Sequence, residues 1–449
     1  MTMRKMLRQT LFLSGAHFVV RVMGFIMRIW LSRELGAAAM GIVELAQNAQ
    51  MLLITPVVSG LPASISRMCA QSERPRQLRI LRCGVLLALA VSIPLMIAAF
   101  LLRVPLALWL GSLQTLPALI VYLPCIPILG VSCALNGYYY GTGRPVPPAL
   151  SEVLEQAVRF LLCMRLVSML RGWPMVLRAA IPALGALAGE LAGLLLMLLC
   201  AARLVLGRIP EKTEPARGIL REMLSLALPL TGMKCVSSLI RTVQSVMIPA
   251  RLVSSGLAQR EAMSLLGMMN GMMMPVIMLP SFVICSLSMV ASPELSRRQA
   301  QGRPLNGIMR RTFTAALGIS LPAMAAVCLL APFFSLRLYR QAELLPMLRR
   351  CCPLVPVMAL GHVAGAMMNG LGLQAKSLRI SLFSGLISLL TGYVLTAMPQ
   401  LRLWGAVIAL AAGQLVSLSC SAAALHSAVQ KRSMRMAFQH SDQKTNGIC

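Results

Sequence analysis

Charged residues are scarce in this sequence. Asp, Glu, Lys and Arg make up 12% of its 449 residues, whereas a soluble domain carries about a quarter. A polar region of domain size is also lacking, because the longest polar segment is the stretch that begins near Lys431. These absences exclude a soluble domain anchored by one or two helices. Apolar runs of roughly 20 residues recur along the whole length, so the sequence predicts an all-α polytopic membrane protein.

The motifs of enzymes and metal sites are also absent from the sequence. It contains no CxxC pair with metal-binding spacing, and the 13 cysteines lie mostly in apolar runs, where a free cysteine behaves as a small hydrophobe. Nucleophile motifs and phosphate-binding glycine loops are lacking too. We therefore expect no enzymatic activity, no metal and no cofactor.

Acidic residues are few: 13 Asp and Glu stand against 42 Lys and Arg, which gives a net charge of +29. Such a charge could serve nucleic-acid binding, but no basic–aromatic stripe or nucleic-acid motif is present. The basic residues lie mostly in short loops between apolar runs, which is how membrane proteins are oriented. We therefore expect membrane lipids, and not nucleic acids, as partners.

The apolar runs divide into twelve predicted membrane spans. The N-terminus, the even-numbered loops and the C-terminal segment hold 25 Lys and Arg, against 11 in the odd-numbered loops. Cytoplasmic loops are the ones enriched in these residues, so the bias predicts that both termini are cytoplasmic. The predicted spans cover residues 10–32, 38–63, 81–102, 115–138, 149–170, 179–202, 222–248, 262–290, 312–331, 345–370, 378–398 and 403–428.

The sequence repeats itself once. The fourth predicted span, "PCIPILGVSCALNGYYYG" at 124–141, resembles the tenth, "PLVPVMALGHVAGAMMNGLG" at 353–372. The end of span two, "ISR" at 65–67, resembles "LSRR" at 295–298 at the end of span eight. Six spans per repeat is an even number, so both lobes insert with the same orientation, as in parallel-repeat transporters. The predicted divisions are an N-terminal lobe at 1–206, a cytoplasmic linker at 207–218, a C-terminal lobe at 219–430 and a cytoplasmic tail at 431–449.

Two arginines lie inside the first apolar run, "FVVRVMGFIMRIW" at 18–30. Arg21 and Arg28 are seven residues apart, close to two helical turns, so both side chains leave the helix on one face. Each costs about 2.5–3.5 kcal/mol at the middle of a membrane helix, which implies a partner or a water-filled cavity. The alternatives are that Arg28 reaches the outer membrane surface and that Arg21 forms a structural ion pair.

Further charges inside the spans form one local pair and one scattered group. Glu155 and Arg159 are four residues apart, so we expect a structural ion pair within one helix. The scattered group consists of three cations and three acids, namely Arg165, Lys234, Arg241, Glu44, Glu152 and Glu190, of which Glu152 is expected near the membrane edge.

The predicted cavity is positive and suits an anionic cargo such as a diphosphate group. We predict that four cations bind this cargo: Arg21, Arg28, Lys234 and Arg241. Glu44 and Glu190 are expected to act either in ion pairs or in coupling transport to Na⁺ or H⁺.

Four stretches resemble the multidrug/oligosaccharidyl-lipid/polysaccharide (MOP) exporter superfamily, and within it the stage V sporulation protein B group. "RVMGFIMR" (21–28) is similar to that group's R-x-x-G-F-x-x-R first helix, and "GLPASISRMCAQ" (60–71) to the end of its second helix. "NGYYYGTGRPVPPALSEVLEQAVR" (136–159) and "GELAGLL" (189–195) resemble two further segments of the group. The resemblance implies two pseudo-symmetric six-helix lobes of the MATE-like kind.

The resemblance also implies a function and a location. The implied function is that of a flippase for undecaprenyl-diphosphate-linked saccharides, including peptidoglycan or polysaccharide precursors, and the implied location is the bacterial inner membrane. Such a flippase works by alternating access around a cationic cavity. The neighbouring lipid II flippases carry an acid where this chain has Ile42, and paired basic residues where it has Ile54 and Thr55. The alternatives are a drug or cation antiporter of the same fold, whose cavity should be acidic, and a non-transporting membrane scaffold for spore or envelope assembly.

Overall fold

The computed structural model describes residues 3–205, 215–301 and 303–445, and every regular element in these ranges is helical. The chain divides into two compact units, Met1–Met272 and Met273–Cys449. Unit 1 contains α1 (Met3–Leu35), α2 (Ala37–Val58), α3 (Leu61–Ala70), α4 (Arg74–Leu101), α5 (Arg103–Trp109), the short η1 (Leu113–Thr115), α6 (Leu116–Tyr122), α7 (Cys125–Gly141), α8 (Val146–Met169), α9 (Met175–Arg178), α10 (Ile181–Val205), α11 (Ala216–Ser254) and α12 (Gln259–Leu266). The π-helical η2 (Gly267–Met273) ends at the boundary.

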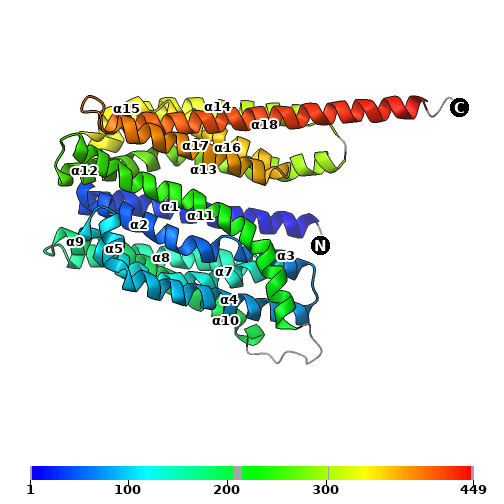
Figure 1. The fold of residues 1–449 in the computed structure, drawn as a ribbon, viewed down its shortest axis with the longest axis horizontal. Coiled ribbons are helices and arrows are strands. Elements are labelled where there is room, and N and C mark those ends of the chain that lie inside the picture. Colours follow the sequence, from blue (N-terminus) through cyan, green and yellow to red (C-terminus); the bar gives the residue numbers. More distant parts are fainter. Residues whose placement is uncertain (1–2, 206–214, 302, 446–449) are drawn as a thin grey trace. The chain divides into compact units, whose positions relative to one another are not determined.

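Unit 2 is built from long helices with one further π-helical segment. Its elements are α13 (Met274–Ala300), α14 (Asn306–Pro332), the π-helical η3 (Phe333–Leu338), α15 (Leu344–Cys351), α16 (Leu354–Gly370), α17 (Gln374–Leu395) and α18 (Leu403–Thr445) (Figure 1). The predicted tail at 431–449 continues α18 as far as Thr445, and its last four residues lie outside the described ranges.

The prediction of an all-α polytopic membrane protein is confirmed. Among the described residues, nine helical segments are long and apolar enough to cross a membrane, and eleven if two bent pairs of helices each count as one span. The remaining predicted span is α8, whose 24 residues could cross the hydrocarbon core but which also carries Glu152, Glu155, Arg159 and Arg165. A set of charges this large in one membrane helix points to partners inside the protein.

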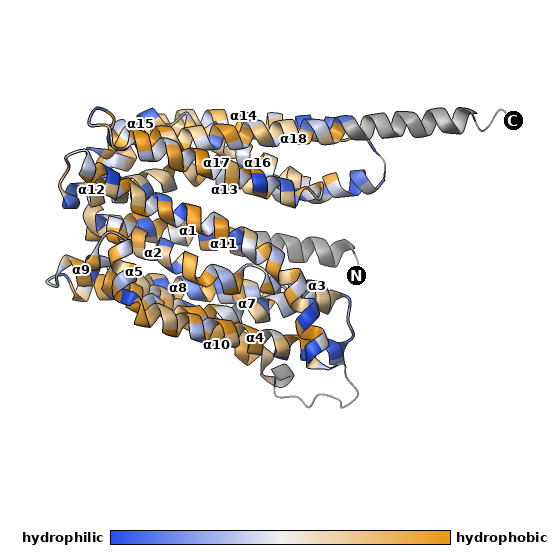
Figure 2. Ribbon diagram, viewed as in Figure 1, coloured by the Kyte–Doolittle hydropathy of each residue, from blue (hydrophilic) through white to orange (hydrophobic). Residues whose placement is uncertain are grey.

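Large apolar side chains cover the outside of the helices. Leu86 on α4, Leu199 on α10 and Leu329 on α14 are 66%, 75% and 80% exposed. Figure 2 shows hydrophobic residues along the lengths of α4 and α10 and hydrophilic residues gathered towards the connections between helices. An apolar surface of this extent would promote aggregation in water, whereas a bilayer requires it.

The repeat seen in the sequence is also a repeat of packing. In unit 1, a Cβ atom on Gly137 of α7 would lie 2.7 Å from the carbonyl oxygen of Pro62 on α3. In unit 2, a Cβ atom on Gly370 of α16 would lie 2.7 Å from the carbonyl oxygen of Ser292 on α13. Pro62 and Ser292 stand three residues before the matching "ISR" and "LSRR" motifs, so the same close approach of two helices recurs in both units.

Both matching helices are entered through a bend at a proline. The segments Leu113–Tyr122 and Cys125–Gly141 meet at 41°, and Leu344–Cys351 and Leu354–Gly370 meet at 53°. Pro124 and Pro353, which were matched in the sequence, are the residues that precede α7 and α16. Proline has no backbone N–H and restricts the residue before it, which accounts for a break at this point in each repeat.

The boundary between the compact units differs from the predicted lobe boundary. The predicted C-terminal lobe begins at 219 and stays a prediction, whereas the compact units meet between 272 and 273; within unit 1, α11 packs against α2 and α3, and α12 packs against α2. Glycines permit this packing: a Cβ atom on Gly41 would collide with the Met263 carbonyl, and one on Gly60 with the Ala227 carbonyl. Most of the predicted linker at 207–218 lies outside the described residues, so the linker stays a prediction.

Candidate functional site

Arg28 lies at the junction of three elements of unit 1. Its guanidinium forms an ion pair with the Glu44 carboxylate on α2. The Nε and Nη2 atoms donate hydrogen bonds to the backbone carbonyls of Gly271 (3.3 Å) and Asn270 (3.2 Å) in η2. The Arg28 side chain is 30% exposed and that of Glu44 10% exposed. Arg28 is therefore held by protein groups and does not depend on reaching the membrane surface.

The π-helical η2 explains why backbone carbonyls are available to Arg28. A π-turn has irregular hydrogen bonding compared with an α-helix, and such turns occur frequently at functional sites. Gly267 begins the segment, and a Cβ atom there would collide with the Ala37 carbonyl of α2. This contact presses η2 onto α2, so that two carbonyls, the Glu44 carboxylate and the Arg28 guanidinium meet in one place.

A neutral polar contact continues from Glu44 along α2 towards α11. The amide Nδ2 of Asn48, one turn after Glu44, donates to Ser245 Oγ and to the Glu44 carbonyl, both at 2.9 Å. The hydroxyl of Thr242 donates to the Asn48 carbonyl at 3.2 Å. Sequence reasoning missed these residues, although polar side chains one turn apart in an apolar helix, as in Glu44 and Asn48, are a signal that could have found them.

The other three predicted cargo-binding cations have exposed side chains. Arg21 lies on α1 two turns before Arg28, and Lys234 and Arg241 lie seven residues apart on α11. Both helices pack against α2. Whether Arg21 and Arg241 face each other, as the repeat predicts, stays a prediction.

A second cluster of charges joins α8 and α10. Arg159 Nη2 lies 2.6 Å from Glu155 Oε1, as the spacing predicts, and 3.3 Å from Glu190 Oε1 on α10. All three side chains are between 12% and 19% exposed. Two carboxylates around one guanidinium leave one excess negative charge if both are ionised. Glu190 is thus a partner of the pair that was predicted to be self-contained.

Three glycines bring α10 close enough for this contact. Gly185, Gly189 and Gly193 are spaced four residues apart and line one face of α10. A Cβ atom on Gly189 would lie 2.6 Å from the Glu155 carbonyl, and one on Gly193 would lie 2.8 Å from Ser151 Oγ. Small residues at this spacing allow membrane helices to approach closely, and here they set the distance between Arg159 and Glu190.

A third pair joins α1 to α8. His17 Nδ1 lies 2.9 Å from Glu152 Oε2, and Glu152 is one turn before Glu155 on α8. From the sequence, Glu152 was expected near the membrane edge. The pairing could not have been found from either residue alone, because the two stand 135 positions apart.

The sequence of the chain matches a known protein family. A family model described as polysaccharide biosynthesis protein matches residues 6–299. Stage V sporulation protein B of Bacillus subtilis (strain 168) is 26% identical over 93% of this chain and 82% of its own length. The lipid II flippase MurJ of the same organism is 21% identical over 92% of this chain and 81% of its own length.

Solved structures show the same fold. An inward-facing multidrug resistance MATE family transporter of the MOP superfamily superposes with a TM-score of 0.74 at 18% identity, over 92% of this chain and 96% of the other. An outward-facing transporter of that family superposes with a TM-score of 0.67 at 18% identity, over 95% and 96%. The MATE-like fold predicted from the sequence is confirmed.

Proposed function

The chain belongs to the polysaccharide biosynthesis protein family, and from that premise we propose that it is a flippase for a lipid-linked saccharide. The family match, the similar proteins and the fold all support a multi-pass membrane transporter. The proposed cargo is a saccharide or peptidoglycan precursor carried on undecaprenyl diphosphate, which crosses the bacterial inner membrane by alternating access. A relative named lipid II flippase and one named for sporulation support this class of cargo.

The observation that carries the proposal is the exposure of three cations on membrane helices. Arg21, Lys234 and Arg241 have exposed side chains on α1 and α11. Against hydrocarbon each would cost about 2.5–3.5 kcal/mol at mid-helix, and water or an anion at the exposed face of these helices would relieve that cost. A diphosphate head group is the anion that this family's lipid-linked cargo would bring.

Arginine suits this role better than lysine. The guanidinium stays charged at every physiological pH and presents its N–H groups as a fork that matches two phosphate oxygens at once. We assign cargo binding to Arg21 and Arg241, with Lys234 as an added positive charge. Arg28 joins α1 to α2 through Glu44 and to η2 through the two backbone carbonyls. We assign it the role of holding these elements together and not of binding the cargo.

Coupling to an ion is assigned to the cluster on α8 and α10. Its excess negative charge, shared by Glu155 and Glu190 around Arg159, can be balanced by H⁺ or Na⁺. Glu44 is the weaker candidate, because Arg28 already neutralises it.

A cation or drug antiporter is the second candidate, and this same acidic cluster is the observation that favours it. The two functions differ in what the exposed cations do: a flippase for an anionic lipid needs Arg21, whereas an antiporter for cationic drugs does not.

The orientation belongs to the proposal as well. Both termini, and the connections near Arg76 and Arg303, should face the cytoplasm. A single cysteine placed in each connection, in a variant depleted of its own cysteines, should react with a membrane-impermeant reagent only after the cytoplasmic side is opened. Labelling of either connection from the outside would refute the two-lobe orientation.

Leaflet-resolved flipping tests the function. The purified chain is reconstituted into vesicles with a fluorescent undecaprenyl-diphosphate saccharide, and the fraction quenched from outside is followed over time. Arg21→Ala should lose nearly all flipping and Arg21→Lys much of it, with the amount of folded protein unchanged. Arg165→Ala removes an exposed arginine from α8 and is the matched control. Full flipping by Arg21→Ala, or a loss that follows protein amount alone, would contradict the proposal.

A further inference from the structure

Five exposed arginines gather in two connections at one end of unit 2. The stretch 337–351 runs from the end of η3 to the end of α15, and the stretch 396–404 joins α17 to α18. Against the five arginines these stretches contain one acid, Glu343. The arginines are Arg337, Arg340, Arg349, Arg350 and Arg402.

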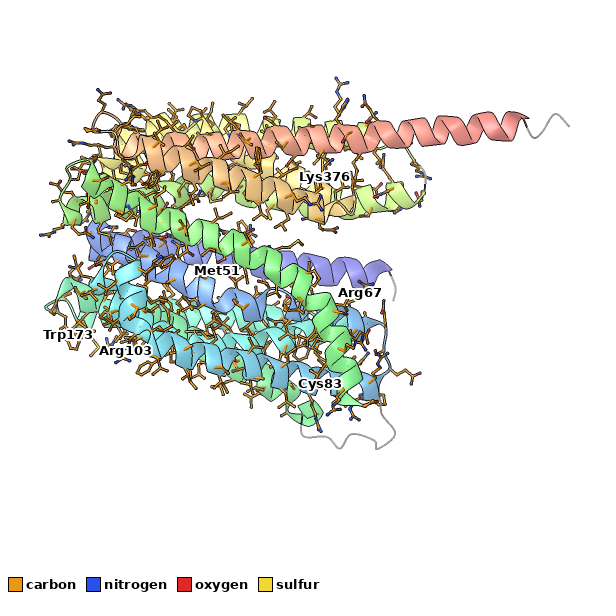
Figure 3. All side chains as sticks on the ribbon, viewed as in Figure 1. Met51, Arg67, Cys83, Arg103, Trp173 and Lys376 are labelled. Atoms are coloured by element: carbon orange, nitrogen blue, oxygen red, sulfur yellow. The ribbon has the colours of Figure 1, made fainter. Side chains whose placement is uncertain are left out.

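None of these arginines forms an ion pair with another residue in the ranges that the structure describes. Arginines in the odd-numbered connections of unit 1 behave differently. Arg178 donates to the Glu34 carbonyl at 2.6 Å, Arg171 lies 3.8 Å from the Glu34 carboxylate, and Arg103 donates to the Phe100 carbonyl at 2.9 Å. Figure 3 labels Arg103 and Trp173, which appear towards the same end of unit 1 in this view. In the described part of the chain these five guanidinium groups thus have no carboxylate partner, although that of Arg350 also contacts the Trp404 ring.

The two connections of unit 2 are tied together by an aromatic contact. Arg350 Cζ lies 4.8 Å from the centre of the Trp404 ring, which fixes the end of α15 against the start of α18. Arg340 and Arg402 adopt left-handed backbone conformations, with φ of 55° and 45°. Glycine is the residue that most easily adopts this conformation, so Arg340 and Arg402 each occupy a position that the backbone would favour for glycine.

Membrane topology does not account for these arginines. The stretch 337–351 follows the ninth predicted span and includes the start of the tenth, and 396–404 spans the junction of the eleventh and twelfth. Both lie on the extracytoplasmic side of the predicted topology, where loops are normally poor in Lys and Arg. Phe333 and Leu336 on the adjoining η3 are 49% and 51% exposed, which places an apolar surface beside the charged one. A surface that is apolar on one side and rich in guanidinium groups on the other fits a lipid with an anionic head group.

We propose that these five arginines bind the diphosphate head of the lipid-linked saccharide at the extracytoplasmic membrane surface, after the cargo has crossed. This inference rests on the proposed function, to which it adds a second, external site. Several guanidinium forks on two joined connections can satisfy the oxygens of two linked phosphates, whereas a phospholipid offers a single phosphate. The external site would hold the cargo as it leaves the cavity and so favour export over return.

Binding to the full chain in phosphatidylcholine nanodiscs tests the site. Native mass spectrometry measures the affinity for undecaprenyl diphosphate and for phosphatidylglycerol, in the Arg21→Ala background so that the interior site does not contribute. The double variant Arg349→Gln/Arg350→Gln should bind the diphosphate lipid about tenfold more weakly, which is the loss of one good charge-assisted contact. Arg340→Gln/Arg402→Gln, which alters the other half of the cluster, should weaken binding in the same direction.

The matched control is Arg310→Gln/Arg311→Gln. These residues are another adjacent pair of exposed arginines, at the start of α14 and so at the far end of that helix from η3. Their removal should leave affinity within about twofold, since any loss would come only from long-range charge. Unchanged binding in both test variants, or equal affinity for phosphatidylglycerol, would overturn the inference.

Flipping measured in parallel separates this inference from the function beneath it. If the wild type flips the lipid-linked saccharide while both test variants bind as tightly as their parent, only the external site is refuted. If the wild type binds the diphosphate lipid through these arginines but does not flip it, the proposed function fails and the external site stands.

Discussion

The two units share a way of packing but not the chemistry of their interiors. Among the described residues, unit 1 carries charged contacts inside its membrane helices, namely Arg28 with Glu44, Arg159 with Glu155 and Glu190, and His17 with Glu152, and a further pair, Arg76 with Glu222, joins the ends of α4 and α11. In unit 2 the apolar stretches 274–293, 312–336 and 380–401 contain no Asp, Glu, Lys or Arg. Its buried polar residues are neutral, among them Ser288, Thr312, Ser320, Ser384 and Ser421.

The two units therefore share their helix packing, whereas the buried charges, which function would require, lie in unit 1. The close approach of Gly137 to Pro62 recurs as Gly370 against Ser292, so helix packing alone can maintain the architecture of both units. The buried charges are concentrated in unit 1, where each must be matched by a partner at a free-energy cost. Unit 1 is therefore the place where cargo binding inside the membrane and ion coupling are to be sought, and the following predictions test that contrast.

The largest effect is expected from Arg159→Met. This change leaves Glu155 and Glu190 facing each other in a mostly buried site without a cation, which should cost about 3–5 kcal/mol of folding free energy. Glu190→Gln should cost far less, because it leaves one carboxylate for one guanidinium. Fluorescence-detected size exclusion after a heat ramp measures both variants. Arg165→Met, on an exposed position of the same helix, is the control, and equal losses in all three would refute the cluster.

The next effect tests whether the repeat in packing is shared by both units. Gly137→Ala and Gly370→Ala each place a Cβ atom 2.7 Å from a backbone oxygen, so each should destabilise the protein by about 1–3 kcal/mol. Gly365→Ala on α16 meets nothing within 4 Å and should be neutral or stabilising by up to about 1 kcal/mol. Thermal unfolding in detergent gives all three values. A strong loss of stability in only one of the first two variants would show that the two units share the sequence motif but not the close helix packing.

A smaller effect should appear in the coupling of Arg28 to Glu44. A double-mutant cycle with Arg28→Gln and Glu44→Gln should give a coupling energy of about 1–2 kcal/mol, because the side chains touch. The combination of Glu44→Gln with Lys234→Gln should be additive within about 0.5 kcal/mol. Additivity in the first cycle would mean that Arg28 is held by the η2 carbonyls alone.

The smallest effect concerns a charge pair of unit 2 outside the membrane-spanning segments. Arg298 donates a hydrogen bond to Glu294 at 2.8 Å, and this contact holds the pKa of Glu294 below its usual value. A lowered folded-state pKa contributes stability above the unfolded-state value of about 4.3, and that stability is lost as the pH falls through the folded-state value. The small difference in unfolding midpoint between the wild type and Glu294→Gln should therefore be constant near neutral pH and vanish in acid. It should also shrink in about 1 M salt, and a difference that survives both treatments would not be electrostatic.

Much of the fold could be predicted from the sequence because it depends on local composition. Runs of apolar residues set the spans, and matched prolines and glycines, such as Pro124 with Pro353, marked the repeat. The prediction of the Glu155–Arg159 contact also follows from spacing, since residues four apart on a helix are neighbours. The packing of α11 and α12 against α2 could not be predicted in this way, because it depends on glycines whose partners lie far away in the chain.

By itself the sequence determined that this is a membrane protein built from a repeated set of helices, and that arginines lie where lipid would exclude them. Only the tertiary structure decided which acid meets which base: Glu44 joins Arg28, Glu190 joins Arg159, and Glu152 joins His17. The physical reason is geometric. Helical periodicity fixes the direction of a side chain relative to its own helix, whereas the partner on another helix depends on the rotation and approach of both, here set by glycines on α2 and α10 and by the π-helical turn of η2.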